Sequence, residues 1–387
     1  MSTKIFYILF LMIFFFSSCE KEDHGSNDRG YKQVLLIYLA VDNNLSSEGL
    51  EKLDLIARYW KKDDGYEILA YLDQKNEDTQ LLRLDKDKKF KLIHTFQPHS
   101  SVDPNFLQEL LINLRKDYPS ETYGLLYFSH ASGWLPENTL NQLNNTRLEP
   151  ELNRVKKSGK EQKSSIGIDR DQEMELYEFA HAIPNNFFEY IVFEACYMAG
   201  IEVAYELKDK TKYILASSSE LFSPGFSYVY PNAINQLVGK QKNLFSFAQK
   251  AFDYWNQASL FTKSCTLSLI NTEDIQQLAN WIRKRYNLFP AINPTNVPCF
   301  DRGTAQLFFD FRTCVASLAK SEQELFQLDQ ILSNIVLWKD NTAMLNTLAG
   351  DKSISAHSGL TCYIPQQQYS SLLPAYQKLA WYKAIAP

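Results

Sequence analysis

The sequence lacks the cysteine and histidine spacings that form zinc sites, although it contains six residues of each type. It has no block of lysine and arginine residues, and its formal net charge of −5 argues against nucleic acids and other anionic partners. It also shows no internal repeat. These absences leave a globular chain of 387 residues, 45% of them hydrophobic, which is enough for one large domain or two moderate ones.

The first 30 residues have the composition of an export segment. The apolar run Ile5 to Phe16 is too short to span a bilayer as a helix, so residues 1–18 are interpreted as a signal peptide. Phe16 to Cys19 resembles a bacterial lipobox, which implies that Cys19 is lipidated, that residues 19–30 form a disordered tether and that lipid holds the protein on a membrane. The acidic start of the tether resembles surface-exported lipoproteins, so we expect an outward-facing outer-membrane lipoprotein of the bacterial cell envelope. An ordinary signal peptide cut nearby is the alternative.

The placement of the other five cysteines argues against a disulfide framework. Cys196, Cys265 and Cys362 each lie in or at the end of a strand-like run, where a thiol behaves as a small hydrophobic side chain. Cys299 and Cys314 lie in the least regular part of the sequence, and a bond between them stays open.

Strand-like and helix-like segments alternate from residue 33 onward. This alternation indicates an α/β fold, a three-layer α/β/α sandwich with a mostly parallel central sheet. Residues 31–230 are expected to form the main domain, and residues 231–387 a helical C-terminal part that completes the sheet with a closing strand near Thr361 to Ile364. The expected strands are 33–41, 66–72, 80–84, 90–95, 122–129, 166–169, 190–195, 212–217 and 264–270, and the expected helices are 45–61, 103–117, 175–181, 200–208, 244–256, 273–286 and 322–335.

Two apolar runs end in residues that can carry chemistry. Thr122 to Ser129 is followed by His130, and Tyr190 to Ala195 is followed by Cys196. Runs of this length are typical of buried strands in a parallel sheet. Sites in open α/β sheets lie at the carboxyl ends of the strands, so a thiol and a base can meet there on one substrate. This layout predicts a thiol hydrolase, although either residue taken alone is more often part of the core.

The residues around both positions narrow the prediction. His130 to Trp134 resembles the His-Gly-x-Gly-Trp motif of the clostripain family of cysteine peptidases, and Glu194 to Leu207 resembles its Asp-Ala-Cys-x-Met segment with the following helix. Tyr38 to Leu45 and Ser358 to Pro365 are similar to two further segments of that family. The resemblance spans most of the chain beyond the export segment. It implies a caspase-like catalytic domain and an endopeptidase that cleaves polypeptides after Arg, or after Lys.

By this resemblance His130 and Cys196 form the catalytic dyad. His130 would protonate the departing amine and help to activate the thiol, and the helix that starts near Gly200 would favour the thiolate of Cys196 through its positive end. The backbone N–H groups of Ala131 and Cys196 would bind the oxyanion. Ala131 stands where the family motif has glycine, so a positive φ at this residue would strain the site and misplace the donor.

Three residues are expected to bind substrate. Glu194 lies two residues before Cys196 on the same face of the strand, and the resemblance places here the carboxylate that meets an arginine or lysine side chain. Ser218 and Glu220 follow the next strand, in a turn that resembles the wall of that pocket. The alternatives are a buried carboxylate paired with an internal Arg or Lys for Glu194, and an ordinary loop for the turn.

The sequence assigns no cofactor and no metal ligand. Asp169, Asp171 and Glu173 alternate as calcium ligands do, but Met174 takes the place of the glycine of an EF-hand and Ala180 the place of its last Glu. We therefore interpret the three acidic residues as a solvated turn. Since clostripain relatives can use calcium, the resemblance leaves calcium open elsewhere in the chain.

A long polar segment, residues 136–165, separates the histidine run from the cysteine run. Clostripain relatives mature by cleavage in the corresponding stretch, and proteolysis concentrates in exposed loops. The segment is therefore interpreted as a processing loop, with cleavage after Lys156, Lys157, Lys160 or Lys163. A tolerated surface insertion is the alternative.

Two other functions stay open. A catalytically silent binding lipoprotein on the same fold would account for Ala131 and for the glutamate at residue 194. A carbohydrate-binding lipoprotein would use the aromatic residues, which make up 14% of the chain, although most of them lie in core-like runs.

Overall fold

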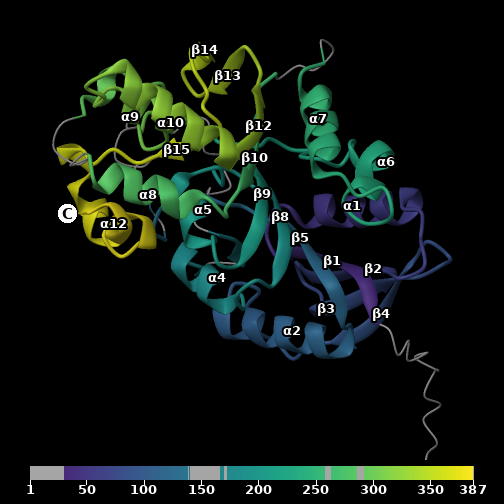
Figure 1. The fold of residues 1–387 in the computed structure, drawn as a ribbon. Coiled ribbons are helices and arrows are strands. Elements are labelled where there is room, and N and C mark those ends of the chain that lie inside the picture. The colour runs from purple at the N-terminus through teal and green to yellow at the C-terminus, as the bar shows by residue number, and fades with distance from the viewer. Residues whose placement is uncertain are drawn as a thin grey trace, which may run out of the picture.

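The computed structural model describes residues 30–137, 139, 166–169, 172–257, 263–285 and 292–386. Its central sheet contains β1 (Tyr31–Val41), β2 (Tyr66–Gln74), β3 (Gln80–Leu84), β4 (Phe90–Thr95), β5 (Ser120–Phe128), β8 (Phe188–Glu194), β9 (Thr211–Ala216), β10 (Thr266–Asn271) and β12 (Val336–Asn341). The nine strands lie in the order β12-β10-β9-β8-β5-β1-β2-β3-β4 (Figure 1). The five strands from β9 to β2 are parallel, and antiparallel strands flank them at both edges.

Helices cover both faces of this sheet (Figure 1). The described helices are α1 (Ser46–Tyr59), α2 (Pro104–Asp117), α4 (Leu176–Ala182), α5 (Ile201–Glu206), α6 (Tyr230–Ala233), α7 (Leu244–Trp255), α8 (Ile275–Arg283), α9 (Phe311–Ala316), α10 (Glu322–Ile335), α11 (Leu373–Tyr376) and α12 (Ala380–Ile385). Three small sheets pair β6 (Ile168–Asp169) with β7 (Gln172–Glu173), β11 (Phe309–Asp310) with β15 (Thr361–Cys362), and β13 (Met344–Thr347) with β14 (Gly350–Ser353). Short 3-10 turns lie at Ile234–Gln236, Pro294–Asn296 and Gln367–Leu372.

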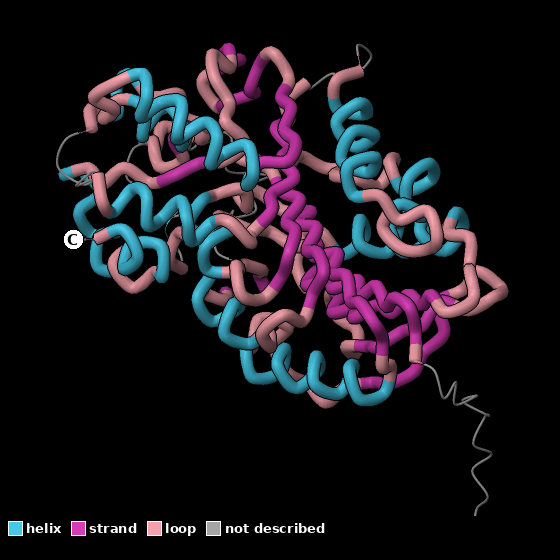
Figure 2. Tube along the Cα trace, in the orientation of Figure 1, coloured by secondary structure: helices cyan, strands magenta, loops and turns pink. Residues whose placement is uncertain are grey.

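Strand β1 shows why the sheet forms the middle layer. Every residue from 33 to 41 is buried. Val34 and Leu36 pack in the core shared with α2, whereas Leu35 and Ile37 pack in the core shared with α1 and α7. An unbroken apolar run is what a strand covered on both faces requires. Figure 2 shows the helical layers on either side of the strands, and the α/β/α sandwich expected from the sequence is confirmed.

The start of α2 follows the local signals in the sequence. The side chain of Asp103 accepts a hydrogen bond from the Asn105 N–H at 2.8 Å, and Pro104 takes the first helical position. The carboxylate satisfies an N–H that the helix itself leaves unpaired, and proline has no N–H to lose there.

The C-terminal part extends the sheet with other strands than expected. The strands that extend the sheet are β10 and β12, whereas the closing strand expected near residues 361–364 is wrong, because β15 pairs with β11 outside the large sheet. Thr361 forms a bridge with Gly200, at the start of α5. A short apolar run shows that a segment is buried, but not which strand pairs with it. The boundary at residue 230 stays a prediction, since strands from both sides share one sheet.

Glu202 on α5 forms hydrogen bonds with the C-terminal part. Its Oε1 accepts hydrogen bonds from the Tyr363 N–H at 2.8 Å and from the Tyr376 hydroxyl at 3.2 Å. Burial raises the pKa of the Glu202 carboxyl to about 7, against the opposing effect of these hydrogen bonds. The helix that follows Cys196 is thus held by a residue 161 positions further along the chain.

The five described cysteines are all free. Cys299 donates a hydrogen bond to Asp301 at 2.7 Å, so the bond to Cys314 that the sequence left open is not formed. The export segment up to residue 29, Cys19 included, lies outside the described residues. Within the described ranges, no helix is both long enough and apolar enough to cross a bilayer.

Candidate active site

The histidine and the cysteine leave the sheet at adjacent points. Strands β5 and β8 are parallel neighbours, and Phe128 pairs with Glu194 in their register. His130 and Cys196 each follow two residues later. The register therefore places both at the same level beyond the carboxyl ends of the strands, where sites in such sheets are found.

The loops that carry the two residues pack against each other. Gly133 has φ +64°, and a Cβ there would lie 2.6 Å from the carbonyl oxygen of Tyr197, so only glycine fits. Tyr197 has φ +61°, an uncommon conformation for a residue with a side chain. Its N–H donates to Ser219 O at 3.1 Å, and its ring stacks on Phe308 with the ring centroids 4.4 Å apart. The backbone next to the cysteine is therefore held on several sides.

Ala131 does not carry the strain that the sequence suggested. Among the described residues other than glycine, a positive φ occurs at four positions, and Ala131 is not one of them. Ala131 is buried and forms an isolated bridge with Ile166, while the left-handed position of the motif falls on Gly133. The alanine fits the backbone, so the condition under which this residue would be strained is not met.

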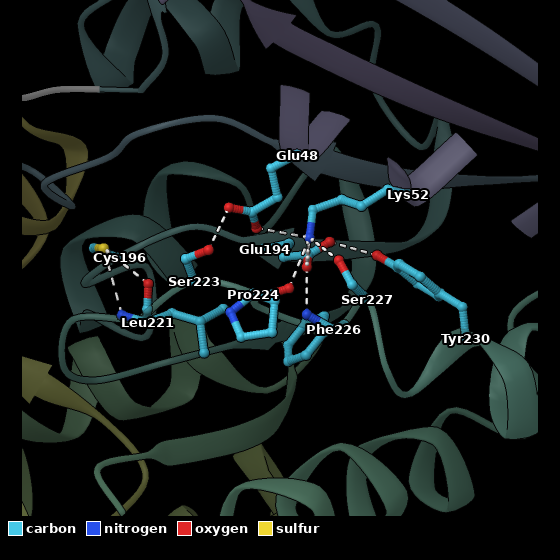
Figure 3. Close-up of polar contacts among 10 residues, drawn as sticks. All are labelled: Glu48, Lys52, Glu194, Cys196, Leu221, Ser223, Pro224, Phe226, Ser227 and Tyr230. Carbon is cyan, nitrogen blue, oxygen red and sulfur yellow. Dashed lines mark hydrogen bonds and ion pairs between the residues drawn. The ribbon is translucent and has the colours of Figure 1, made fainter. Parts of the chain in front are cut away.

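Cys196 is partly exposed, and its sulfur lies against the backbone of Leu221. The Leu221 N–H donates to Sγ at 3.4 Å, and the thiol donates to the Leu221 carbonyl at 3.7 Å (Figure 3). Burial raises the pKa of the Cys196 thiol and the Glu220 carboxylate adds to this, whereas the Leu221 N–H and Arg302 lower it. The net direction is upward, so the resting side chain is a thiol. The thiolate expected from the start of α5 is not favoured at rest.

The imidazole of His130 forms a hydrogen bond with the side-chain amide of Asn44. Its Nε2 lies 2.9 Å from Oδ1 of Asn44, and within the described structure no hydrogen bond joins it to Cys196. Burial lowers the pKa of His130, with Glu48 acting in the opposite direction, so the imidazole is neutral at neutral pH. Because Asn44 Oδ1 can only accept, Nε2 carries the proton and Nδ1 keeps the lone pair that a base needs. Asn44 lies in the first segment that resembles the family, but no pattern in the sequence assigns it this contact.

The alkylation of Cys196 by iodoacetamide is expected to be slow at neutral pH and to rise continuously from about pH 6 to about pH 9. The pKa of the thiol lies above its ordinary value, so the reactive thiolate is a minor species over this range. Arg302→Gln should slow the reaction further, because Arg302 lowers that pKa. The rate is measured by mass spectrometry with mapping of the labelled peptide. Arg312→Gln, which breaks an exposed pair with Asp329, is the control; a rate that levels off below about pH 8 would contradict the expected direction.

Glu194 is buried and paired with an internal lysine. Its Oε1 lies 2.7 Å from Nζ of Lys52, and the carboxylate also accepts hydrogen bonds from the Phe226 N–H and the Tyr230 hydroxyl (Figure 3). Burial raises the pKa of Glu194, and Lys52 acts against this. The structure therefore contradicts a carboxylate that stands open to a substrate cation. Glu194 instead forms an internal ion pair, which is the alternative that the sequence left open.

The other two residues expected to bind substrate are also engaged within the protein. The Ser218 hydroxyl is buried and lies 3.1 Å from Nε2 of His357, so it does not line an open pocket. Glu220 pairs with Arg302, with Nη1 to Oε1 at 3.0 Å. Glu194 and Glu220, the two acidic candidates, are thus each paired with a cationic side chain of the protein itself.

The sequence contained a signal for Lys52 but not for its partner on β8, Glu194. The buried residues of α1 recur at spacings of three and four, and Lys52 lies among them. A lysine on a buried helix face must find a partner. That partner is 142 residues away, and no pattern in the sequence joins the two. We find no comparable signal for Arg302 or His357.

Within the described ranges, no group of three or more His, Cys, Asp or Glu side chains is arranged to hold a metal ion. Asp169 is buried and accepts a hydrogen bond from the Ser101 N–H at 2.9 Å, so it is not part of a solvated turn as expected. Several predicted residues lie outside the described residues: Asp171, Lys156, Lys157, Lys160 and Lys163.

Comparison with known proteins agrees with the motifs. A model of the clostripain family matches residues 37–385. The fold is similar to an inactive zymogen C11 protease from Parabacteroides distasonis, with 25% identity and a TM-score of 0.77 over 92% of this chain and 99% of that one. It is also similar to a secreted C11 cysteine protease from Bacteroides thetaiotaomicron, solved with an irreversible peptide inhibitor, with 23% identity and a TM-score of 0.75 over 92% of this chain and 98% of that one. Comparison with curated proteins gives no match. Because the family model covers nearly all of the described chain, and its two motifs fall at the carboxyl ends of β5 and β8, the chain belongs to the clostripain family of cysteine peptidases.

Proposed function

We propose that the protein is a cysteine endopeptidase in which His130 and Cys196 hydrolyse peptide bonds. The observation that carries the proposal is the register of β5 and β8, which brings both residues to the same level of the sheet edge. The sequences around both residues resemble the histidine and cysteine motifs of the clostripain family. The contact between Gly133 and Tyr197 supports it further, because it fixes one catalytic loop against the other.

In the proposed reaction the imidazole of His130 takes the proton of the Cys196 thiol as the sulfur attacks the peptide carbonyl carbon. The imidazolium then gives this proton to the departing amine as the C–N bond breaks. Water hydrolyses the thioester, with His130 as the base, and restores the thiol. The pKa directions of both groups favour a neutral pair at rest, so the proton transfer accompanies the attack and does not precede it.

The N–H groups of Ala131 and Cys196 are the proposed donors to the oxyanion. The unstrained backbone of Ala131 removes the main objection to this role. The left-handed conformation of Tyr197, held by Ser219, supports a fixed direction for the chain after Cys196.

The family resemblance implies cleavage after Arg or Lys, but two ion pairs weigh against that preference. Glu194 is paired with Lys52, and Glu220 is paired with Arg302. We therefore limit the proposed function to the reaction and its dyad, and treat the preference as a separate question.

We also propose that the export segment delivers the protein to the cell envelope and that Cys19 anchors it there by lipid, on the strength of residues 1–30 alone. Cleavage within residues 136–165 is proposed as a maturation step. The relative from Parabacteroides distasonis is described as an inactive zymogen, which is consistent with such a step. The lysines of this segment remain the proposed cleavage points.

The proposed function is tested by labelling the mature protein with a set of peptidyl acyloxymethylketones that differ in the residue next to the reactive group. We expect at least one probe to attach to Cys196 in the wild type and none to attach to Cys196→Ala. Peptide mapping locates the label. Absence of labelling by every probe, or labelling that persists in the variant, would favour the catalytically silent binding protein instead.

A further inference from the structure

We propose that Lys52 is a specificity-determining residue, whose ammonium group takes the place beside Glu194 that a substrate cation would need, so that the enzyme accepts an uncharged side chain before the scissile bond. This inference rests on the proposed function. It concerns Glu194, the acidic residue two positions before the nucleophile.

Glu194 lies at the right distance from the nucleophile for such a role. It precedes Cys196 by two residues, which corresponds to about 7 Å along a strand. The loop after β9 contacts both residues, since Leu221 holds the sulfur and Phe226 donates to the Glu194 carboxylate (Figure 3). In the proposal, the side chain of the residue whose carbonyl is attacked extends toward the Glu194 end of this loop.

The ammonium of Lys52 is fully coordinated within the protein. Its three N–H donors meet Glu194 at 2.7 Å, the Pro224 carbonyl at 2.9 Å and the Ser227 hydroxyl at 2.8 Å. The side chain is 1% exposed, and its charge lies 4.3 Å from the centre of the Phe128 ring. Phe128 and Glu194 are the register pair two residues before His130 and Cys196, so the lysine charge contacts both strands just before the proposed dyad.

The carboxylates around Lys52 have their oxygens engaged. Glu194 Oε1 binds Lys52, and Oε2 accepts from the Tyr230 hydroxyl. Glu48 Oε1 lies 3.0 Å from Lys52, and Oε2 accepts from the Ser223 hydroxyl at 2.6 Å. The space is closed as well, because a Cβ on Gly225 would lie 2.2 Å from Glu194 Oε1.

A substrate cation would therefore have to break these contacts or lie beside a like charge. Two like charges about 4 Å apart repel each other strongly when water does not separate them. The carboxylate of Glu48 would offset this repulsion, but Lys52 already binds one of its oxygens and the Ser223 hydroxyl donates to the other. The second acidic candidate, Glu220, has its own cation in Arg302. The geometry thus favours an uncharged side chain at this position.

The experiment compares two peptides that differ only in arginine or citrulline before the scissile bond, because citrulline is an uncharged analogue of arginine. In the wild type we expect kcat/KM to favour citrulline. In Lys52→Ala and Lys52→Met, the ratio of arginine to citrulline should rise by roughly 10- to 100-fold, since Glu194 is left without its cation. Lys52→Arg keeps the cation and should keep the wild-type ratio. Arg58→Ala, on the exposed face of α1, should leave the ratio unchanged.

The double variant Lys52→Ala/Glu194→Gln separates selectivity from stability. If the arginine preference comes from the released carboxylate, the rise in the ratio should disappear in this variant. A merely structural role for Lys52 would lower turnover of both peptides equally and leave the ratio constant. A wild type that prefers arginine, or a constant ratio in both Lys52→Ala and Lys52→Met, would overturn the proposal.

A binding measurement tests Lys52 without turnover. Calorimetry compares the same two peptides with Cys196→Ala and with Cys196→Ala/Lys52→Ala, after circular dichroism has shown that both proteins are folded. We expect the first protein to bind the citrulline peptide more tightly and the second to reverse that order. Failure of the wild type to hydrolyse any peptide would overturn the proposed function alone, whereas an unchanged order of binding, or no binding by either protein, would overturn the role of Lys52.

Discussion

Cys196→Ala and His130→Ala are each expected to lower kcat/KM for peptide hydrolysis by about 10⁴- to 10⁶-fold, the range seen when one member of a catalytic unit is removed. The reason is that sulfur attack and proton transfer belong to one step, so neither residue can act without the other. The double variant should be no less active than the worse single variant, because the losses are not additive. Turnover is measured with a peptide that the wild type cleaves.

Matched variants show that the effect is specific. Cys265→Ala changes a cysteine of the core, and His181→Ala changes an exposed histidine of α4. Both proteins should keep turnover within a few-fold of the wild type. If His130→Ala retained most of the activity, the base would have to be another group and the proposed dyad would be lost.

The second large effect concerns stability. Glu194→Ala is expected to reduce the free energy of unfolding by about 3 kcal/mol, because it leaves the Lys52 ammonium buried without its main partner. The value is placed at the lower end of the usual range, since Glu48 remains 3.0 Å from Lys52. Urea unfolding at neutral pH, with a check that the slope against urea is constant, measures the change.

Two further variants test whether this loss of stability comes from the buried ion pair. Asp54→Ala removes the partner of Arg58 in an exposed pair on the same helix and should cost less than about 1 kcal/mol. The double variant Glu194→Ala/Lys52→Met removes both charges and should be less destabilised than the sum of the two single variants. Equal costs for the buried and the exposed pair would mean that the Lys52 charge is well solvated, against its 1% exposure.

The layers of the fold could be predicted from the sequence because their signals are local. The run of residues 34–41 is apolar without a break, as a strand buried on both faces must be. Asp103 and Pro104 mark a helix start by chemistry confined to three residues. The fold class follows from such signals and is confirmed, and the family and the cysteine-type peptidase, which the resemblance of the two motifs implies, are confirmed as well.

The contacts around the site could not be predicted, because they join distant segments. Lys52 on α1 meets Glu194 on β8, and Ser218 meets a histidine 139 residues later. A carboxylate two residues from a nucleophile has the same sequence pattern whether it faces a substrate or an internal lysine. The choice depends on where α1 lies against the sheet, which is a property of the packed molecule.

The pairing of β5 with β8 has a consequence for how the molecule is connected. The chain between these strands includes residues 140–165, yet the strands themselves are joined directly by the ladder from Gly124 with Tyr190 to Phe128 with Glu194. A single cut in that connection would therefore give two polypeptides that share one uninterrupted sheet. Each fragment would carry one half of the dyad, His130 on the first and Cys196 on the second. The nicked protein would migrate as two bands under denaturing conditions and as one particle in solution.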